Sequence, residues 1–179
     1  MINREVLIIT GPLAAYKSSL AKTLSQQFNI PLLCKDDIKE TLFEQLSQSE
    51  ASKRLSEKTF LMMLNNVKNH TKVILEANFK QHEYDALTKA LKKQNRSFVT
   101  LYLYGQADIL YQRYKVREHT RHEAHKAYGL MSLDQFKRSV QEHALRFYDH
   151  DLLTIDTSFI SYQDKDKLTS EVFDKLNTL

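Results

Sequence analysis

One segment restricts the fold of this chain more than any other: VLIITGPLAAYKSSLAKTL, residues 6–24. An apolar run rich in β-branched residues ends at Gly11, and a helical pattern begins at Lys17 and Ser18. The spacing is close to G-x-x-x-x-G-K-[ST], a loop that binds phosphate between a strand and a helix. Tyr16 stands where that pattern has its second glycine. The segment therefore raises the question of whether this loop still binds phosphate.

Short apolar segments alternate with helical patterns along the rest of the chain. The predicted strands are residues 5–10, 30–34, 72–77, 97–104 and 151–157. Apolar residues at helical spacing separate each strand from the next. This alternation predicts a single α/β domain over residues 1–179, with a five-stranded parallel sheet covered by helices on both faces. The loops that follow the strands would meet at one edge of the sheet, where ligands bind.

Several helices can be placed in more detail. A short helix is expected from Asp37 to about Leu46, and Asp108 and Ser132 are expected to cap two later helices. A longer helix is marked by residues at helical spacing: Leu55, Thr59, Met62, Met63 and Val67. We expect the Met62–Met63 pair to lie in the core.

Composition and charge narrow the class of protein. The chain has 179 residues, 42% of them hydrophobic, which is enough for a full hydrophobic core. No apolar run approaches the roughly 18 residues of a membrane span, and the N-terminus lacks the features of an export signal. The one cysteine, Cys34, has no partner for an internal disulfide. These features predict a cytoplasmic location and no membrane partner, and no motif predicts an oligomeric state.

The net charge of +4 favours an anionic ligand, with nucleic acid among the candidates and ordinary surface charge as the alternative. A loop between a strand and a helix directs backbone N–H groups and the positive end of the helix at an anion, usually a triphosphate. Lys17 would reach the β- and γ-phosphates, and the Ser18 hydroxyl would bind Mg²⁺. The residues expected to hold the nucleotide phosphates are Gly11, Leu13, Ala14, Ala15, Tyr16, Lys17, Ser18 and Ser19.

Tyr16 leaves two conformations open for this loop. Either its ring turns outward and the backbone N–H groups still form the cradle, or the loop is distorted. An ordinary strand–helix connection with a surface lysine is the alternative to a phosphate site.

Two adjacent carboxylates, Asp36 and Asp37, follow the second predicted strand. A hydroxyl group that attacks a phosphoryl group must lose its proton, and a carboxylate at hydrogen-bond distance can accept it. Asp36 is the better candidate because it stands nearer the end of the strand. Asp37 could cap the following helix, and both aspartates could also be merely structural.

With these two loops in order, the chain resembles the P-loop small-molecule and polynucleotide kinases, a group of AAA-type kinases with a three-layer P-loop fold. Their motif [RK]-D-D-x-[RK] after the second strand is matched by KDDIK, residues 35–39. The resemblance implies that Asp36 is the general base and that Lys39 contacts a phosphate of the substrate. The Tyr16 position departs from the family pattern, which has glycine before the lysine.

The resemblance extends over nearly the whole chain. Glu76-Ala77-Asn78 matches the end of the family's third strand, and it implies that Glu76 lies near the Mg²⁺ and Asn78 near the substrate. The segment IDT, residues 155–157, is similar to the one that lines the adenine side. The family's basic lid would span about 113–131, and its candidate residues are Arg113, Arg117, Arg121, His122 and His125.

The arginine spacing has a structural reading of its own. Arg113, Arg117 and Arg121 are four residues apart, so a continuous helix would carry them on one face. That face could close over the triphosphate, with Arg113 on the nucleotide and Arg117 and Arg121 at the transferred phosphoryl group. A solvated basic face is the alternative.

The resemblance implies a phosphotransferase that depends on ATP and Mg²⁺. Its acceptor would be a hydroxyl group of a small molecule or of the 5′ end of an oligonucleotide. A second hypothesis is a non-catalytic module that keeps the fold and binds a nucleotide or RNA. A scaffold without any nucleotide is the third.

Overall fold

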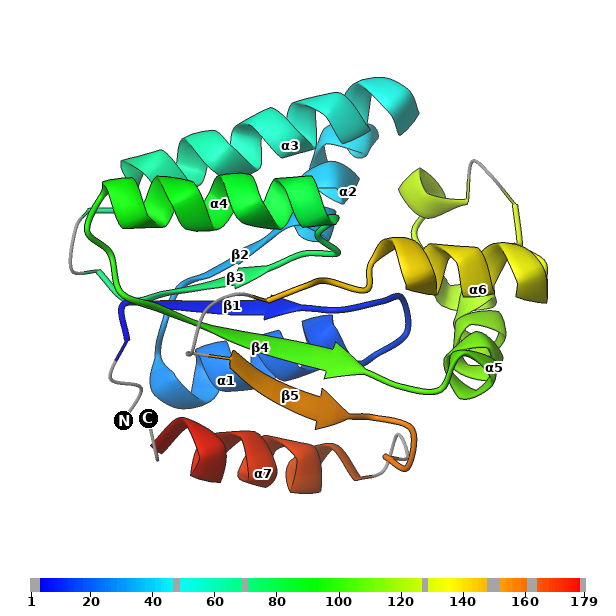
Figure 1. Cartoon of the computed structure of the whole chain (residues 1–179). Helices are drawn as coiled ribbons and strands as arrows, with labels where there is room; N and C mark the ends of the chain where they lie inside the picture. Colours follow the sequence, from blue (N-terminus) through cyan, green and yellow to red (C-terminus); the bar gives the residue numbers. More distant parts are fainter. Residues whose placement is uncertain are drawn as a thin grey trace.

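The computed structural model describes residues 4–46, 49–68, 71–126, 129–147, 152–160 and 164–177. Its five strands form one parallel sheet in the order β2-β3-β1-β4-β5, which confirms the predicted α/β architecture (Figure 1). The strands are β1 (Val6–Thr10), β2 (Leu32–Cys34), β3 (Val73–Glu76), β4 (Phe98–Tyr104) and β5 (Leu152–Asp156). β1 occupies the centre of the sheet, so the loop that follows it has neighbours on both sides.

Helices cover both faces of the sheet. α1 (Lys17–Phe28) and α7 (Lys165–Asn177) lie on one face, and α3 (Ser49–Asn66) and α4 (Gln81–Lys93) lie on the other (Figure 1). The remaining helices are α2 (Lys35–Leu46), α5 (Ala107–Arg117), η1 (Glu118–Thr120), η2 (Glu123–His125) and α6 (Leu133–Glu142). α5 and α6 stand beyond the carboxyl ends of β1 and β4 (Figure 1). Across the described residues, no helix combines the length and the apolar character needed to cross a membrane.

The core is divided between the two faces of the sheet. Successive side chains of a strand point to opposite faces, so Leu7 and Ile9 pack on the side of α1 and α7, while Val6 and Ile8 pack on the side of α3 and α4. Every residue of β1 is buried. A strand covered on both faces reads as a continuous apolar run, and this explains why residues 6–10 were recognisable in the sequence.

The buried face of α3 differs from the prediction. Met62 and Met63 are 59% and 39% exposed, so their expected place in the core is wrong. The buried residues are instead four apart along the helix, and they are Ser52, Ser56, Phe60 and Leu64. Two small serines on that face let α3 approach its neighbours closely, so hydrophobicity alone indicated the wrong side.

Helix starts were predicted with mixed success. The Ser132 cap is confirmed, because its hydroxyl accepts a hydrogen bond from the Gln135 N–H at 3.3 Å within a reciprocal capping box. The Asp108 cap is wrong, since Gln106 caps α5 and Asp108 lies inside the first turn. The Asp108 carboxylate instead pairs with Lys137 of α6 at 3.0 Å.

The first residues of two elements next to the site also differ from the prediction. α2 begins at Lys35, two residues before the expected Asp37, and β2 begins at Leu32 rather than at residue 30. Both aspartates therefore lie in the first turn of α2, where the helix dipole favours negative charge. Residue 151, the expected start of the last strand, and residues 127–128 of the expected lid lie outside the described residues.

Gly11 determines how the chain leaves β1. Its φ of +141° is one that side-chain-bearing residues rarely adopt, and a Cβ atom there would overlap the carbonyl oxygen of Leu103 in β4. The glycine is thus required by close backbone approach as well as by its dihedral angle. The loop that follows is held tight against the sheet.

We expect Gly11→Ala to lower the free energy of unfolding by about 2–4 kcal/mol, because the new methyl group forces β4 and the loop apart. Urea denaturation measures the loss. Gly129→Ala is the control: φ there is also positive, at +66°, but no atom lies within 4 Å of the added Cβ. It should cost only about 1 kcal/mol, and equal losses in the two variants would refute the close-approach argument.

Candidate active site

A cavity of about 470 Å³ opens where the loop after β1, the first turns of α2 and the segment after β3 meet the segment that contains η1 and η2. Its walls bring together many of the residues expected from the sequence: Leu13, Ala14, Lys17, Ser18, Asp36, Asn78, Arg117 and Arg121. Three further candidates, Asp37, His122 and His125, also line it. The expected residues that do not line it are Gly11, Ala15, Tyr16, Ser19, Lys39, Glu76 and Arg113. Four further residues line the cavity that were not predicted as site residues: Lys22, Glu40, Tyr114 and Thr120.

The backbone of the loop after β1 alternates in handedness. Ala14 and Tyr16 both have φ of 61°, in the left-handed region, and Ala15 between them has a negative φ. Such alternation makes successive N–H groups converge on one point, as in anion-binding nests. The loop therefore keeps the curl of a phosphate site without a glycine before Lys17.

The Tyr16 ring points away from the cavity. It packs against the core cluster on the α1 side, and the guanidinium carbon of Arg113 lies 4.5 Å from its ring centroid. A left-handed tyrosine costs about 1–2 kcal/mol, and a cation–π contact returns about 0.5–2 kcal/mol. Of the two conformations considered for Tyr16, the structure has the outward ring, with a loop whose backbone alternates in handedness.

Lys17 is only 8% exposed and lies along the loop. Its ammonium donates a hydrogen bond to the carbonyl oxygen of Pro12 at 2.8 Å. Burial lowers the pKa of Lys17, while the nearby charges of Glu76 and Asp36 act in the opposite direction. The ammonium group has donors to spare for a ligand in the cavity that it lines.

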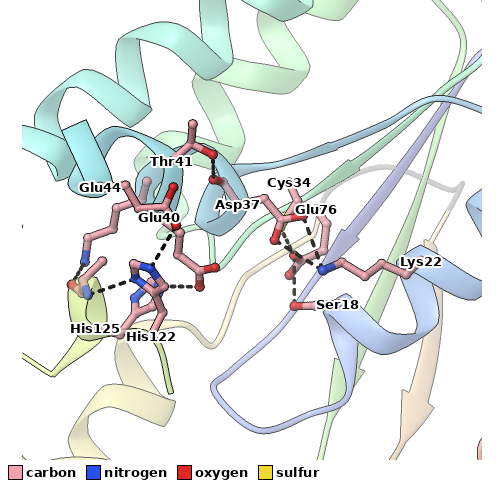
Figure 2. A network of polar contacts seen from close by, with 12 residues as sticks. Ser18, Lys22, Cys34, Asp37, Glu40, Thr41, Glu44, Glu76, His122 and His125 are labelled. Carbon is pink, nitrogen blue, oxygen red and sulfur yellow. Dashed lines mark hydrogen bonds and ion pairs between the residues drawn. The ribbon is translucent and has the colours of Figure 1, made fainter. Parts of the chain in front are cut away.

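Glu76 lies at the end of β3 and is 2% exposed. Its Oε2 accepts two hydrogen bonds, from the Ser18 hydroxyl at 3.2 Å and from the Cys34 thiol at 2.9 Å (Figure 2). Burial raises the pKa of Glu76, and the charge of Lys17 acts in the opposite direction. The pKa of the Cys34 thiol is raised by burial and by the neighbouring Glu76. The Ser18 hydroxyl and the Glu76 carboxylate lie close together, and both offer oxygen atoms, the ligands that Mg²⁺ prefers.

The two aspartates of α2 have different surroundings. Asp36 lines the cavity and makes no ion pair or side-chain hydrogen bond with any described residue. Asp37 also lines the cavity, but it faces Lys22 at 3.5 Å, with both side chains about half exposed. Lys22 stands one helical turn after Ser18, and that spacing of four was the signal that could have identified it.

The three arginines do not share one helical face: Arg113 and Arg117 lie four residues apart on α5, but Arg121 lies beyond its end, so the expectation of one helix through all three is wrong. α5 ends at Arg117, η1 follows, and Arg121 is extended with φ −70° and ψ 143°. Arg121 pairs with Glu118 at 2.9 Å, whereas the Arg117 side chain makes no hydrogen bond or ion pair with any described residue. Arg113 lies outside the cavity, on the far side of Tyr16.

Two histidines join the segment around η2 to α2. His125 Nε2 lies 3.0 Å from Glu40 Oε1, and His122 Nε2 lies 3.6 Å from Glu44 Oε1 (Figure 2). Burial lowers the pKa of His125, against the attraction of Asp36 and Glu40. Asp36, Glu40 and Glu44 are four residues apart on α2, a pattern from which this acidic face could have been predicted.

Lys39 lies next to this contact rather than in the cavity wall. Its ammonium donates a hydrogen bond to the carbonyl oxygen of Ala124 in η2 at 2.7 Å. Burial lowers its pKa, with Asp36 acting in the opposite direction. The residue expected to contact a phosphate thus holds α2 against η2 in this structure.

The strand order and the curled loop define a P-loop protein. Residues 6–143 match the model of the AAA domain family, and the chain belongs to that family. A comparison with curated proteins found no match to the sequence.

Solved structures of kinases share the fold over almost the whole chain. A putative kinase from Chloroflexus aurantiacus is 19% identical with a TM-score of 0.76, covering 96% of this chain and 97% of its own. Shikimate kinase from Bacteroides thetaiotaomicron is 18% identical with a TM-score of 0.63, covering 97% and 98%. A deoxyadenosine kinase from M. mycoides with bound dATP is 15% identical with a TM-score of 0.55, covering 96% and 99%. The resemblance to P-loop kinases is thereby confirmed for the fold.

We expect Glu76→Gln to raise the free energy of unfolding by about 1 kcal/mol at pH 8, because the amide oxygen still accepts the two hydrogen bonds and the buried charge is gone. Burial raises the pKa of Glu76 in the folded protein, so its protonated form is favoured by folding. The contribution of Glu76 to stability is therefore full below the pKa of an unfolded glutamate, about 4.3, and is lost as the pH rises. The gain from the substitution should shrink between pH 8 and pH 5 in urea denaturation.

Glu83→Gln is the matched control. Burial acts to raise the pKa of Glu83, but hydrogen bonds from the Lys80 N–H and from Lys35 outweigh it and lower the pKa. Its carboxylate stabilises the fold above the unfolded pKa, so this substitution should destabilise at pH 8 and less so as the pH falls. A Glu76→Gln variant that is less stable than the parent at pH 8 would contradict the argument.

Proposed function

We propose that this protein transfers the γ-phosphoryl group of ATP or another nucleoside triphosphate, together with Mg²⁺, to a hydroxyl group of a small molecule. The observation that carries the proposal is Asp36: its carboxylate makes no hydrogen bond or ion pair with any described residue, and it lines the same cavity as Lys17 and Ser18. A carboxylate that can still accept a hydrogen bond, opposite a phosphate loop, is the arrangement that deprotonation of an acceptor hydroxyl requires.

The donor half of the site is built on the loop after β1. Its converging N–H groups and Lys17 would hold the β- and γ-phosphates, and Ser18 and Glu76 would hold Mg²⁺ directly or through water. Bound Mg²⁺ would neutralise charge on the phosphate oxygens. Lys17 reaches the phosphates by exchanging the Pro12 carbonyl for a phosphate oxygen.

The acceptor half is built on α2 and the segment around η1 and η2. As the acceptor oxygen bonds to the γ-phosphorus, its proton passes to Asp36 and the bond from the γ-phosphorus to the β,γ-bridging oxygen breaks. Arg117 and Arg121 line the cavity and would stabilise the charge on the transferred group. Asn78, also in the wall, would orient the acceptor through its amide.

The contacts between α2 and η2 favour a small acceptor over an oligonucleotide. Glu40 with His125, and Lys39 with the Ala124 carbonyl, close the cavity on the side of α2. An oligonucleotide 5′ end would have to break them, whereas a small polar molecule fits a cavity of about 470 Å³ beside the phosphates. In this proposal residues 113–131 act as the lid of a single kinase domain.

A non-catalytic nucleotide- or RNA-binding module is the competing function. It was suggested by Tyr16, whose ring would interfere with catalysis only if it entered the cavity. The ring packs against the core instead, which supports the catalytic proposal.

We expect Asp36→Asn to lower the rate of phosphoryl transfer by about 10²–10⁴-fold, because the amide cannot accept the acceptor's proton. Nucleotide affinity should change little. The measurement is turnover of ATP with Mg²⁺ in the presence of sugars, nucleosides, aminoglycosides and 5′-hydroxyl oligonucleotides, with binding followed by calorimetry.

Asp37→Asn is the matched control, since it removes a neighbouring carboxylate that is paired with Lys22. Its turnover should stay within about fivefold of the parent protein, as expected for loss of an exposed ion pair. Equal turnover in Asp36→Asn and the parent would remove Asp36 from the role of base. Nucleotide binding without turnover of any acceptor, but with affinity for RNA, would favour the binding module.

A further inference from the structure

Tyr114 of α5 lines the cavity although it was not predicted as a site residue. The residue is only 3% exposed. Its ring packs against Tyr111 of the same helix, at 6.2 Å between ring centroids, and against Phe136 of α6, at 5.2 Å. α5 and α6 stand together beyond the carboxyl ends of β1 and β4 (Figure 1). The phenol is therefore held in a fixed position at the cavity wall.

The phenol oxygen of Tyr114 already accepts two hydrogen bonds. The backbone N–H of Met131 and Nη1 of Arg121 both donate to it, each at 3.3 Å. A phenol oxygen that accepts two hydrogen bonds has only its own O–H left to pair. Among the described residues, none accepts a hydrogen bond from that O–H. Because a buried donor without an acceptor opposes folding, the cavity is the place from which an acceptor would come.

The wall around Tyr114 offers hydrogen-bond donors and positive charge. Arg117 follows it by three residues on α5, and its guanidinium makes no hydrogen bond or ion pair with any described residue. Arg121 lines the same cavity. A guanidinium has five donors and no acceptor, so neither arginine can accept from the Tyr114 O–H. A ligand that satisfies all three side chains must present several oxygen acceptors and negative charge, as a phosphoryl group does.

We propose that Tyr114 contacts the transferred γ-phosphoryl group and donates its O–H to one of the non-bridging oxygens. The inference rests on the proposed function, because it adds a catalytic residue to that reaction. Negative charge is spread over these oxygens in the transition state. A donor that is already fixed in place binds that charge more strongly than it binds the ground state. The Met131 N–H and Arg121 position the phenol oxygen, and the O–H is left for the phosphoryl group.

The test is calorimetric binding of ADP and Mg²⁺ to the full chain, with and without fluoroaluminate, which mimics the transferred phosphoryl group. Fluoroaluminate should tighten ADP binding by the parent protein. Tyr114→Phe should lose about 10²-fold of this gain in affinity, the effect of removing one donor to a developing oxyanion. Its affinity for ADP alone should stay within about threefold of the parent's, because the lost contact is made in the transition state.

The outcomes separate the inference from the function on which it rests. An undiminished gain in Tyr114→Phe overturns the inference and leaves the proposed function standing. A parent protein in which fluoroaluminate gives no gain overturns the proposed function, and the inference with it.

Tyr111→Phe is the matched control. Tyr111 belongs to the same helix and the same group of rings, and its O–H donates to the carbonyl oxygen of Met131 at 3.1 Å. It does not line the cavity. Both variants should lose some stability in urea denaturation, but Tyr111→Phe should keep the full gain from fluoroaluminate. Equal losses of the gain in the two variants would show that Tyr114 acts through the packing of α5, and would overturn the inference.

Replacement of Tyr114 by difluorotyrosine separates the O–H donor from the support of Arg121, and it serves as the test if Tyr114→Phe does not fold. The fluorinated phenol keeps its oxygen but loses its proton at a lower pH than tyrosine does. Once ionised, it still accepts from Arg121 and can no longer donate to a phosphoryl oxygen. The gain from fluoroaluminate should therefore fall faster with rising pH in this variant than in the parent. A gain that follows the parent's at every pH overturns the inference.

Discussion

The close contact between Gly11 and the Leu103 carbonyl is the constraint on which the rest of the site depends. It presses the start of the loop against β4, and the chain then returns to α1 through left-handed residues at Ala14 and Tyr16. This path places Lys17 and Ser18 at the mouth of the cavity, at the positive end of α1. A phosphate loop therefore depends on a backbone course, and a glycine before the lysine is one way among others to achieve it.

The buried carboxylate of Glu76 is the second organising feature. Its Oε2 accepts hydrogen bonds from Ser18 of α1 and Cys34 of β2, and Lys17 at the start of α1 favours its charged form, so three elements meet at one carboxyl group. Burying a carboxylate in this way opposes folding. The sequence keeps it where β3 meets the cavity, and proteins commonly sacrifice stability in this way at functional sites.

Much of the architecture could be predicted because a sheet buried on both faces produces a recognisable sequence pattern. Apolar strand segments are separated by helical patterns, and polar residues follow each strand. The same reasoning placed Lys17, Ser18, Asp36 and Asn78 around one cavity. The direction of the Tyr16 ring could not be predicted, because it depends on Arg113, nearly a hundred residues later in the chain.

Three other features could not be predicted from local sequence patterns either. The buried side of α3 carries serines because close packing, not hydrophobicity, selects it. The arginine spacing suggested one helix, but α5 ends at Arg117, so Arg121 lies beyond the helix that carries Arg113 and Arg117. Lys39 donates a hydrogen bond to a backbone carbonyl of η2. No sequence pattern shows which backbone carbonyl a side chain will reach.

The contacts between α2 and η2 have a kinetic consequence. They are made by glutamates, histidines, a lysine and a backbone carbonyl, and none of them involves a phosphate. These contacts therefore do not depend on a bound phosphate. If the protein is the phosphotransferase proposed above, a reactant that approaches from the side of α2 must first separate α2 from η2, and the rate of that separation limits its entry from that side.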